Sequence, residues 1–194
     1  MSTIVSLTPR DFALLAQEAY TAGCAGHRKR SRAIVRQTAA GLCLAFPRTD
    51  NIDCWGADFD ILPMAVPAPV RCTGASGTLL PAVLTTIGNQ PVTLVGHSLG
   101  AVIVIMAAVS LTLAGKPPAA VYGFEPPRVS PGIGVRALLR NVPVSLYKNG
   151  NDIVPDVPLG WNHAALITHI GKPERPFPNV QDHALARVLQ ALSL

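Results

Sequence analysis

A serine lies between two glycines in the segment Gly96-His97-Ser98-Leu99-Gly100. The apolar run 92–95 precedes this segment, and the longer apolar stretch 99–115 begins within it. These flanks predict a strand, a sharp turn and a helix, so that the hydroxyl of Ser98 stands clear of the sheet. The glycines leave room where side chains would collide with the neighbouring strand and helix. The pattern predicts a nucleophilic serine, with a plain tight turn as the alternative. The amide of Leu99, at the helix N-terminus, is then an oxyanion donor.

A serine nucleophile needs a histidine base, and the base needs a carboxylate that orients it. Asp152 follows the apolar run 144–147, which is an expected strand. It therefore lies at the carboxyl end of a strand, where the sites of open α/β sheets assemble. Asp156, four residues later in a proline-flanked loop, is the alternative acid.

Three histidines follow these aspartates in the chain. His183 precedes the last expected helix and is the favoured base, because an imidazole in such a loop can reach Ser98. His169 falls within an expected strand and is expected to be packed or hydrogen-bonded, and His163 lies in a connection. His97 is too close to Ser98 to act as its base, and is expected to pack and hydrogen-bond around the turn.

Strands and helices are expected to alternate along the chain. Thr8, Pro9 and Asp11 form a helix start with a capping-box pattern. Further helices are expected over 80–87, 99–115 and 185–192 and from Ser130, and strands over 33–37, 42–46, 92–95, 120–124, 144–147 and 165–170. This alternation predicts an α/β fold, with a mainly parallel sheet and helices on both faces. No linker or repeat interrupts it, so residues 1–194 are expected to form a single domain.

The composition fits a compact domain with a large core. Apolar residues make up 49% of the 194 residues and charged residues 14%, which excludes a disordered chain. The net charge is +5, and the densest basic run covers residues 27–32. A solvated turn is the favoured interpretation of this run, with transient contact to an anionic lipid surface as the alternative. Aromatic residues are only 5% and there is no nucleic-acid motif, so no nucleic-acid partner is expected.

The four cysteines form no CxxC pair and no zinc-site spacing. Neither a metal nor an organic cofactor is expected from the sequence. Residues 1–10 lack the pattern of a secretory signal, which favours reduced thiols and a cytoplasmic protein. Signal-less export and release by lysis are the alternatives. The apolar stretch 99–115 is slightly short for a membrane span, and a buried helix is expected there instead.

These motifs resemble the class 3 lipases, the fungal-type triacylglycerol lipases and their bacterial relatives. Residues 94–101 match the family's VxGHSLGGA elbow, and residues 124–129 echo its Gly-Ser-Pro-Arg-Val stretch. The family's Asn-x-x-Asp-x-Val-Pro segment matches residues 149–155, which implies that Asp152 is the catalytic acid. Its Asp-His before the final helix matches residues 182–183, which implies His183 as the base. Its His-Val-Gly strand resembles residues 169–171, so the resemblance gives His169 no catalytic role.

An upstream motif of the family, Phe-Arg-Gly-Thr/Ser followed by Trp and Asp, keeps its spacing here. It is matched by Phe46-Pro47-Arg48-Thr49, Trp55 and Asp58, with Arg-Gly replaced by Pro-Arg. The match implies that Thr49 supplies the second oxyanion donor. Residues 50–57 would form a short lid.

The resemblance implies an α/β-hydrolase fold and a carboxylic-ester hydrolase. Its substrates would be lipids or other acyl esters, and a triacylglycerol lipase, a phospholipase A1-like enzyme and a short-chain esterase are all compatible with the motifs. The reaction would use Ser98, Asp152 and His183 and pass through an acyl-enzyme. The alternative is a catalytically silent hydrolase fold that acts as a binding or effector module, which the altered Pro47-Arg48 would favour.

Overall fold

The structure is a computed structural model that describes residues 7–22, 33–39, 41–46, 87–88 and 90–193. The α-helices are α1 (Pro9–Ala22), α4 (Leu99–Leu113), α5 (Gly134–Leu138) and α6 (Leu185–Ala191), and the 3₁₀ turns are η3 (Val154–Asp156) and η4 (Val180–His183). The strands are β1 (Ile34–Thr38), β2 (Gly41–Phe46), β3 (Val92–His97), β4 (Ala120–Phe124), β5 (Val144–Asn149) and β6 (Ile167–Ile170).

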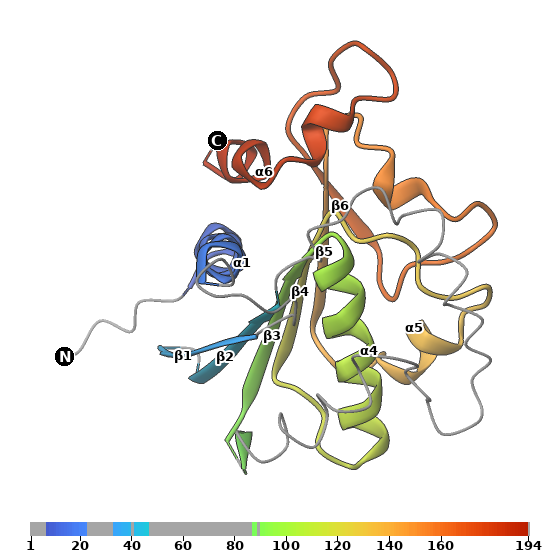
Figure 1. Ribbon diagram of the computed structural model, residues 1–194. Coiled ribbons are helices and arrows are strands. Elements are labelled where there is room, and N and C mark those ends of the chain that lie inside the picture. The colour runs from blue at the N-terminus through green and yellow to red at the C-terminus, as the bar shows by residue number, and fades with distance from the viewer. Residues whose placement is uncertain (1–6, 23–32, 40, 47–86, 89, 194) are drawn as a thin grey trace, which may run out of the picture.

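The described strands form one sheet in the order β1-β2-β3-β4-β5-β6. Strand β1 is antiparallel to β2, and every later neighbour pair is parallel. Crossover connections between parallel strands are right-handed. When successive connections also advance in the same direction along the sheet, their helices lie on the same face, as α4 and α5 do. Helices α1 and α6, from opposite ends of the chain, cover the other face (Figure 1). The predicted α/β sheet with helices on both faces is therefore confirmed.

A separate hydrophobic core lies on each face of the sheet. Leu42, Leu44 and Phe46 of β2 pack into the core beneath α4, whereas Cys43 and Ala45 pack into the core beneath α1. This alternation follows from the two-residue period of a strand. Because both faces are covered, β2 and β3 are apolar almost throughout, as the sequence suggested.

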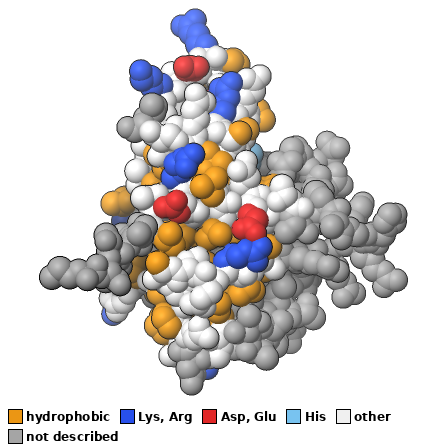
Figure 2. All heavy atoms as spheres, turned by 90° about the vertical axis from the view of Figure 1, so that its left-hand side faces the viewer, with side chains coloured by type: hydrophobic (Ala, Val, Ile, Leu, Met, Phe, Trp, Pro, Cys, Tyr) orange, Lys and Arg blue, Asp and Glu red, His pale blue; other side chains and the backbone are white. Residues whose placement is uncertain are grey.

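Helix α1 begins with the expected capping box. The amide and hydroxyl of Thr8 donate to Asp11 Oδ2 at 2.8 and 2.7 Å, and the amide of Asp11 donates to Thr8 Oγ1 at 3.3 Å. Small side chains let the helix lie close to the sheet, and three of them are fully buried: Ala13, Ala16 and Ala19. Figure 2 shows the side of the molecule that carries α1 and α6, where charged side chains are interspersed with hydrophobic ones.

The prediction that a helix starts at Ser130 is wrong. Ser130 pairs with Asn162 through backbone hydrogen bonds in both directions, at 3.3 and 2.6 Å, and α5 begins only at Gly134. Serine is a common helix N-cap, but the backbone of Ser130 is hydrogen-bonded to Asn162, which is distant in sequence. The helix expected over 80–87 lies outside the described residues except for Ile87, which is buried.

Helix α4 is the buried helix expected from the apolar stretch 99–115. It packs against the sheet and contributes nine buried residues, which explains why polar residues are rare in it. In the described part of the chain, no helix is both long enough and apolar enough to span a bilayer.

Candidate active site

Ser98 occupies a single-residue turn between strand β3 and helix α4. Its φ is 57° and its ψ is −127°, a left-handed conformation that costs a non-glycine residue about 1–3 kcal/mol. The turn is held by the amide of Ser98, which donates to the carbonyl of Phe124 at 2.9 Å, and by the amide of Ala101, which donates to the carbonyl of Ser98 at 2.9 Å. The strain is therefore located at the residue that the sequence marks as the nucleophile.

Gly96 allows the strand and the helix to approach each other at this turn. A Cβ atom at position 96 would lie 2.3 Å from the carbonyl oxygen of Gly100 and 2.6 Å from the amide of Ala101. Both contacts are with backbone atoms, which cannot swing aside. The steric reason expected for the flanking glycines is thus met at Gly96.

Three side chains from distant parts of the chain form one hydrogen-bonded series. Ser98 Oγ lies 2.9 Å from His183 Nε2, and His183 Nδ1 lies 2.7 Å from Asp152 Oδ2. An ionised Asp152 only accepts hydrogen bonds, so Nδ1 carries the proton and Nε2 is free to accept the proton of Ser98. All three residues are buried, with 1%, 7% and 0% of their surface exposed. This arrangement has the geometry of a serine catalytic triad.

The structure shows which of the two candidate acids, Asp152 and Asp156, can orient the histidine. Asp152 ends the turn after β5 and faces His183, and its Oδ1 accepts the amide of Val154 at 3.1 Å. Asp156, in η3, instead accepts a hydrogen bond from Lys148 Nζ at 2.6 Å. Among the two aspartates, only Asp152 is in a position to orient the histidine.

The other late histidines lie elsewhere. His163 is half-buried in the connection before β6, and burial lowers its pKa below 6.5. His169 lies on β6 but is exposed, so of the two expectations for it, packed or hydrogen-bonded, the packed one is wrong. Strand β6 is at the edge of the described sheet, and both of its central residues, Thr168 and His169, are exposed.

Asp182 fixes the loop that carries His183. Its Oδ2 accepts the amide of Asn151 at 3.0 Å, and its Oδ1 accepts a hydrogen bond from Arg187 at 2.9 Å. Its backbone carbonyl accepts a hydrogen bond from the side chain of Asn149 at 3.0 Å. These contacts connect the loop after β5 directly to η4, and so hold the acid and the base opposite each other.

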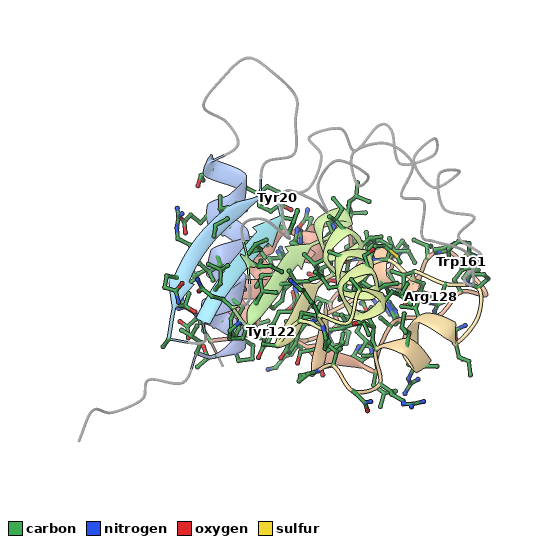
Figure 3. The ribbon with its side chains drawn as sticks, turned by 90° about the horizontal axis from the view of Figure 1, so that it is seen from below. Tyr20, Tyr122, Arg128 and Trp161 are labelled. Atoms are coloured by element: carbon green, nitrogen blue, oxygen red, sulfur yellow. The ribbon has the colours of Figure 1, made fainter. Side chains whose placement is uncertain are left out.

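His97 supports the base through the backbone, as its expected role at the turn suggested. Its Nε2 donates to the carbonyl of His183 at 2.9 Å, which leaves Nδ1 as the acceptor for the hydroxyl of Tyr20. Tyr20 comes from α1, on the face of the sheet opposite α4 (Figure 3). The N-terminal helix is thereby linked to the position of His183.

The environment of Asp152 favours its ionised form. Burial opposes ionisation, but the hydrogen bond from His183, the charge interaction with that ring and the amide of Val154 are among the interactions that outweigh it. Together they hold the pKa of Asp152 below 3.8. A carboxylate that stays charged can stabilise a protonated His183 during a reaction.

Glu125 is a residue that sequence reasoning missed, apart from quoting it within residues 124–129. It is fully buried beside Asp152, and burial, followed by the Asp152 carboxylate, raises its pKa to about 11. One signal could have found it. Glu125 directly follows strand β4, so it reaches the same edge of the sheet as Asp152, which follows the neighbouring strand β5.

Leu99 is the first residue of α4, so its amide is among those that lack an intrahelical acceptor. It lies next to Ser98, at the place expected for an oxyanion donor. The second expected donor, Thr49, lies outside the described residues, as do Trp55, Asp58 and the expected lid over 50–57.

A sequence model of the lipase (class 3) family matches residues 58–161. The chain belongs to the class 3 lipase family. The matched range contains the serine turn and Asp152, whereas His183 follows it. A comparison with curated protein sequences finds no match.

Solved structures of fungal lipases have the same fold. A Rhizomucor miehei triacylglyceride lipase is 24% identical at a TM-score of 0.61, with 79% of this chain and 74% of that chain covered. A mutant form of MDLA from Penicillium cyclopium is also 24% identical, at a TM-score of 0.57 and with 81% of this chain covered. A Rhizopus microsporus var. chinensis lipase is 18% identical at 0.59, with 92% and 88% covered.

This class 3 lipase chain is short beside some of these relatives. It spans 65% of the Penicillium chain and 66% of a Rhizomucor miehei lipase chain in a propeptide complex, just under two thirds of each. What the structural similarity to these lipases establishes is the α/β-hydrolase fold.

Proposed function

We propose that this protein is a carboxylic-ester hydrolase that acts on lipid or other acyl esters through Ser98, His183 and Asp152. The observation that carries the proposal is the buried series of hydrogen bonds from Ser98 Oγ to His183 to Asp152, at 2.9 and 2.7 Å. Its position on a strained strand-to-helix turn in a class 3 lipase fold supports the same reaction.

In the first half of the reaction, Ser98 Oγ attacks the ester carbonyl carbon while His183 Nε2 takes the hydroxyl proton. The carbonyl oxygen becomes an oxyanion, which the amide of Leu99 stabilises, with Thr49 as the proposed second donor. When this intermediate collapses, the bond between the carbonyl carbon and the alcohol oxygen breaks. His183 gives its proton to that oxygen, the alcohol leaves, and the acyl group stays on Ser98.

In the second half, water attacks the acyl-enzyme. His183 Nε2 takes a proton from the water, the bond from the acyl carbon to Ser98 Oγ breaks, and His183 returns the proton to Ser98. Asp152 keeps its charge in both halves and stabilises the imidazolium that forms in each. The carboxylic acid product then leaves.

Two exposed apolar side chains in the segment before His183 suit an acyl or lipid substrate. Phe177 and Val180, in the segment that leads to His183, are 72% and 68% exposed. Exposed apolar side chains of this size are suited to contact with hydrocarbon chains or with a lipid surface. We propose lipase-type substrates, such as those of a triacylglycerol lipase or a phospholipase A1-like enzyme, on this ground, with a short-chain esterase as the alternative.

The experiment is hydrolysis of p-nitrophenyl esters from acetate to palmitate by wild type and by Ser98→Ala. Wild type is expected to hydrolyse at least part of the series, and Ser98→Ala to lose that activity by several powers of ten. A preference for long chains and a rise in rate when substrate exceeds its solubility would identify a lipase, and their absence an esterase. Equal inactivity of both proteins on every ester would overturn the proposal and favour a silent binding module.

A further inference from the structure

Two buried carboxyl groups lie beside the base of the site, although the reaction above uses only one. Glu125 follows β4 and Asp152 follows β5, and these strands are parallel neighbours. Both residues are fully buried. A carboxyl oxygen of each lies within 4.8 Å of the other and of a ring nitrogen of His183.

The hydrogen bonds around Glu125 leave one of its oxygens unsatisfied. Its Oε1 accepts the amide of Asn149 at 2.6 Å, but its Oε2 is buried and receives no hydrogen bond from the described residues. The nearby cation Lys148 is bonded to Asp156 at 2.6 Å, so its charge is already matched. Two negative charges at this distance, in two fully buried side chains, would repel each other strongly.

The backbone of Glu125 is also unusual. Its φ is 51°, in the left-handed region that non-glycine residues rarely adopt. In the family's Gly-Ser-Pro-Arg-Val stretch, which aligns with the Pro127-Arg128-Val129 of this chain, a glycine falls at this position. A strained, fully buried carboxyl group at the edge of a reactive site is an arrangement that stability alone disfavours.

We propose that Glu125 is a positioning residue of the site: as a neutral carboxylic acid it donates its proton from Oε2 to Asp152, so that the two carboxyl groups carry one negative charge beside His183. The proposal rests on the ester-hydrolase function given above. The proton satisfies the otherwise unpaired Oε2. It also gives Asp152 a third donor beside His183 and the amide of Val154, and these three fix the carboxylate against the ring. The raised pKa of Glu125 and the lowered pKa of Asp152 agree with this division of the charge.

The first test is a double-mutant cycle on kcat with wild type, Glu125→Gln, Asp152→Ala and the double variant. Glutamine keeps the size, an acceptor for Asn149 and a donor for Asp152, so Glu125→Gln alone is expected to lower kcat by about threefold or less. Without Asp152, the repulsion on Glu125 disappears, and Glu125 can ionise and serve His183. Adding Glu125→Gln to Asp152→Ala is therefore expected to lower kcat by a further tenfold or more, on the order of couplings within a triad.

The pH dependence of the cycle adds a readout that a purely structural role would not move. The kcat of Asp152→Ala is expected to rise with pH as Glu125 ionises, in addition to any rise that all the variants share, and this additional rise should be absent from the double variant. If Glu125→Gln lowers kcat by the same factor in both backgrounds, at every pH, Glu125 only holds the amide of Asn149 and the proposal is wrong.

The second test is spectroscopic, so it does not depend on enzyme activity, and it uses proteins in which Asp152 is unchanged. The infrared spectrum of the wild-type protein at about pH 8 is expected to contain the carbonyl band of a protonated carboxyl group, which Glu125→Gln removes and Glu174→Gln, at an exposed carboxyl, retains. Absence of the band would overturn the proposal, as would a bound divalent cation that neutralises both carboxylates in its place. Failure of the ester-hydrolase proposal is distinguishable, because ester hydrolysis would then be absent, or would not depend on Ser98, while the infrared band remains.

Discussion

Replacing His183 with alanine is expected to lower kcat for ester hydrolysis by about 10⁴- to 10⁶-fold, with KM close to the wild-type value. His183 Nε2 lies 2.9 Å from Ser98 Oγ, where, in the proposed mechanism, it takes the proton in each half of the reaction. Without the imidazole, none of the described residues offers another base within hydrogen-bond distance of the Ser98 hydroxyl. Ser98 would then attack the ester only at the low rate of an unactivated hydroxyl. The substitution leaves the exposed side chains of Phe177 and Val180 in place, so the loss should appear in kcat.

His169→Ala is the matched control for this experiment. It removes an exposed imidazole from β6 that the described site does not use, and its kcat is expected to equal that of wild type. Steady-state kinetics on the best p-nitrophenyl ester would measure both variants. Wild-type turnover by a folded His183→Ala protein would show that another group is the base.

Glu125→Gln is expected to become increasingly more stable than wild type as the pH rises. The pKa of Glu125 is about 11 in the folded protein against 4.5 for the free side chain, so the folded state holds a proton that the unfolded state releases. Stability from this group is fully present below about pH 4.5 and is lost as the pH rises toward about 11. The slope is up to about 1.4 kcal/mol of unfolding free energy per pH unit, and glutamine has no such dependence.

Urea unfolding at about pH 6 and about pH 9 would measure this difference between the two proteins. Glu174→Gln, which removes a negative charge from an exposed position, is the control and is expected to change with pH like wild type. Parallel pH dependences for wild type and Glu125→Gln would mean that Glu125 is ionised in the folded protein, contrary to its buried position beside Asp152.

The sheet, the serine turn and helix α4 could be predicted from the sequence because their signals are local. The apolar runs predicted the buried strands and α4, and the glycines at fixed distances from Ser98 predicted the turn. The structure has these elements at the same positions. The start of α5 could not be predicted in this way. Ser130 has the residue type of an N-cap, but its backbone pairs with Asn162, which is distant in sequence.

The site itself was only partly predictable from the residues. Asp152 and Asp156 stand in the same loop, and the ion pair of Asp156 with Lys148 that separates them is a tertiary contact. His97 and Tyr20 meet only because α1 packs on the sheet beside β3. Glu125 follows a buried strand and has a residue type that is usually exposed, so its burial depends on the neighbouring strand β5 and could not be derived from its own segment.

The central claim is that Ser98 is the nucleophile of a working ester-hydrolase site, and reaction with a fluorophosphonate probe tests it most directly. The probe forms a stable covalent bond with an activated serine, and intact-mass analysis with peptide mapping locates the adduct. We expect one adduct on wild type, located at Ser98, and none on Ser98→Ala. A wild-type protein that stays unlabelled, or equal labelling of Ser98→Ala, would contradict the account.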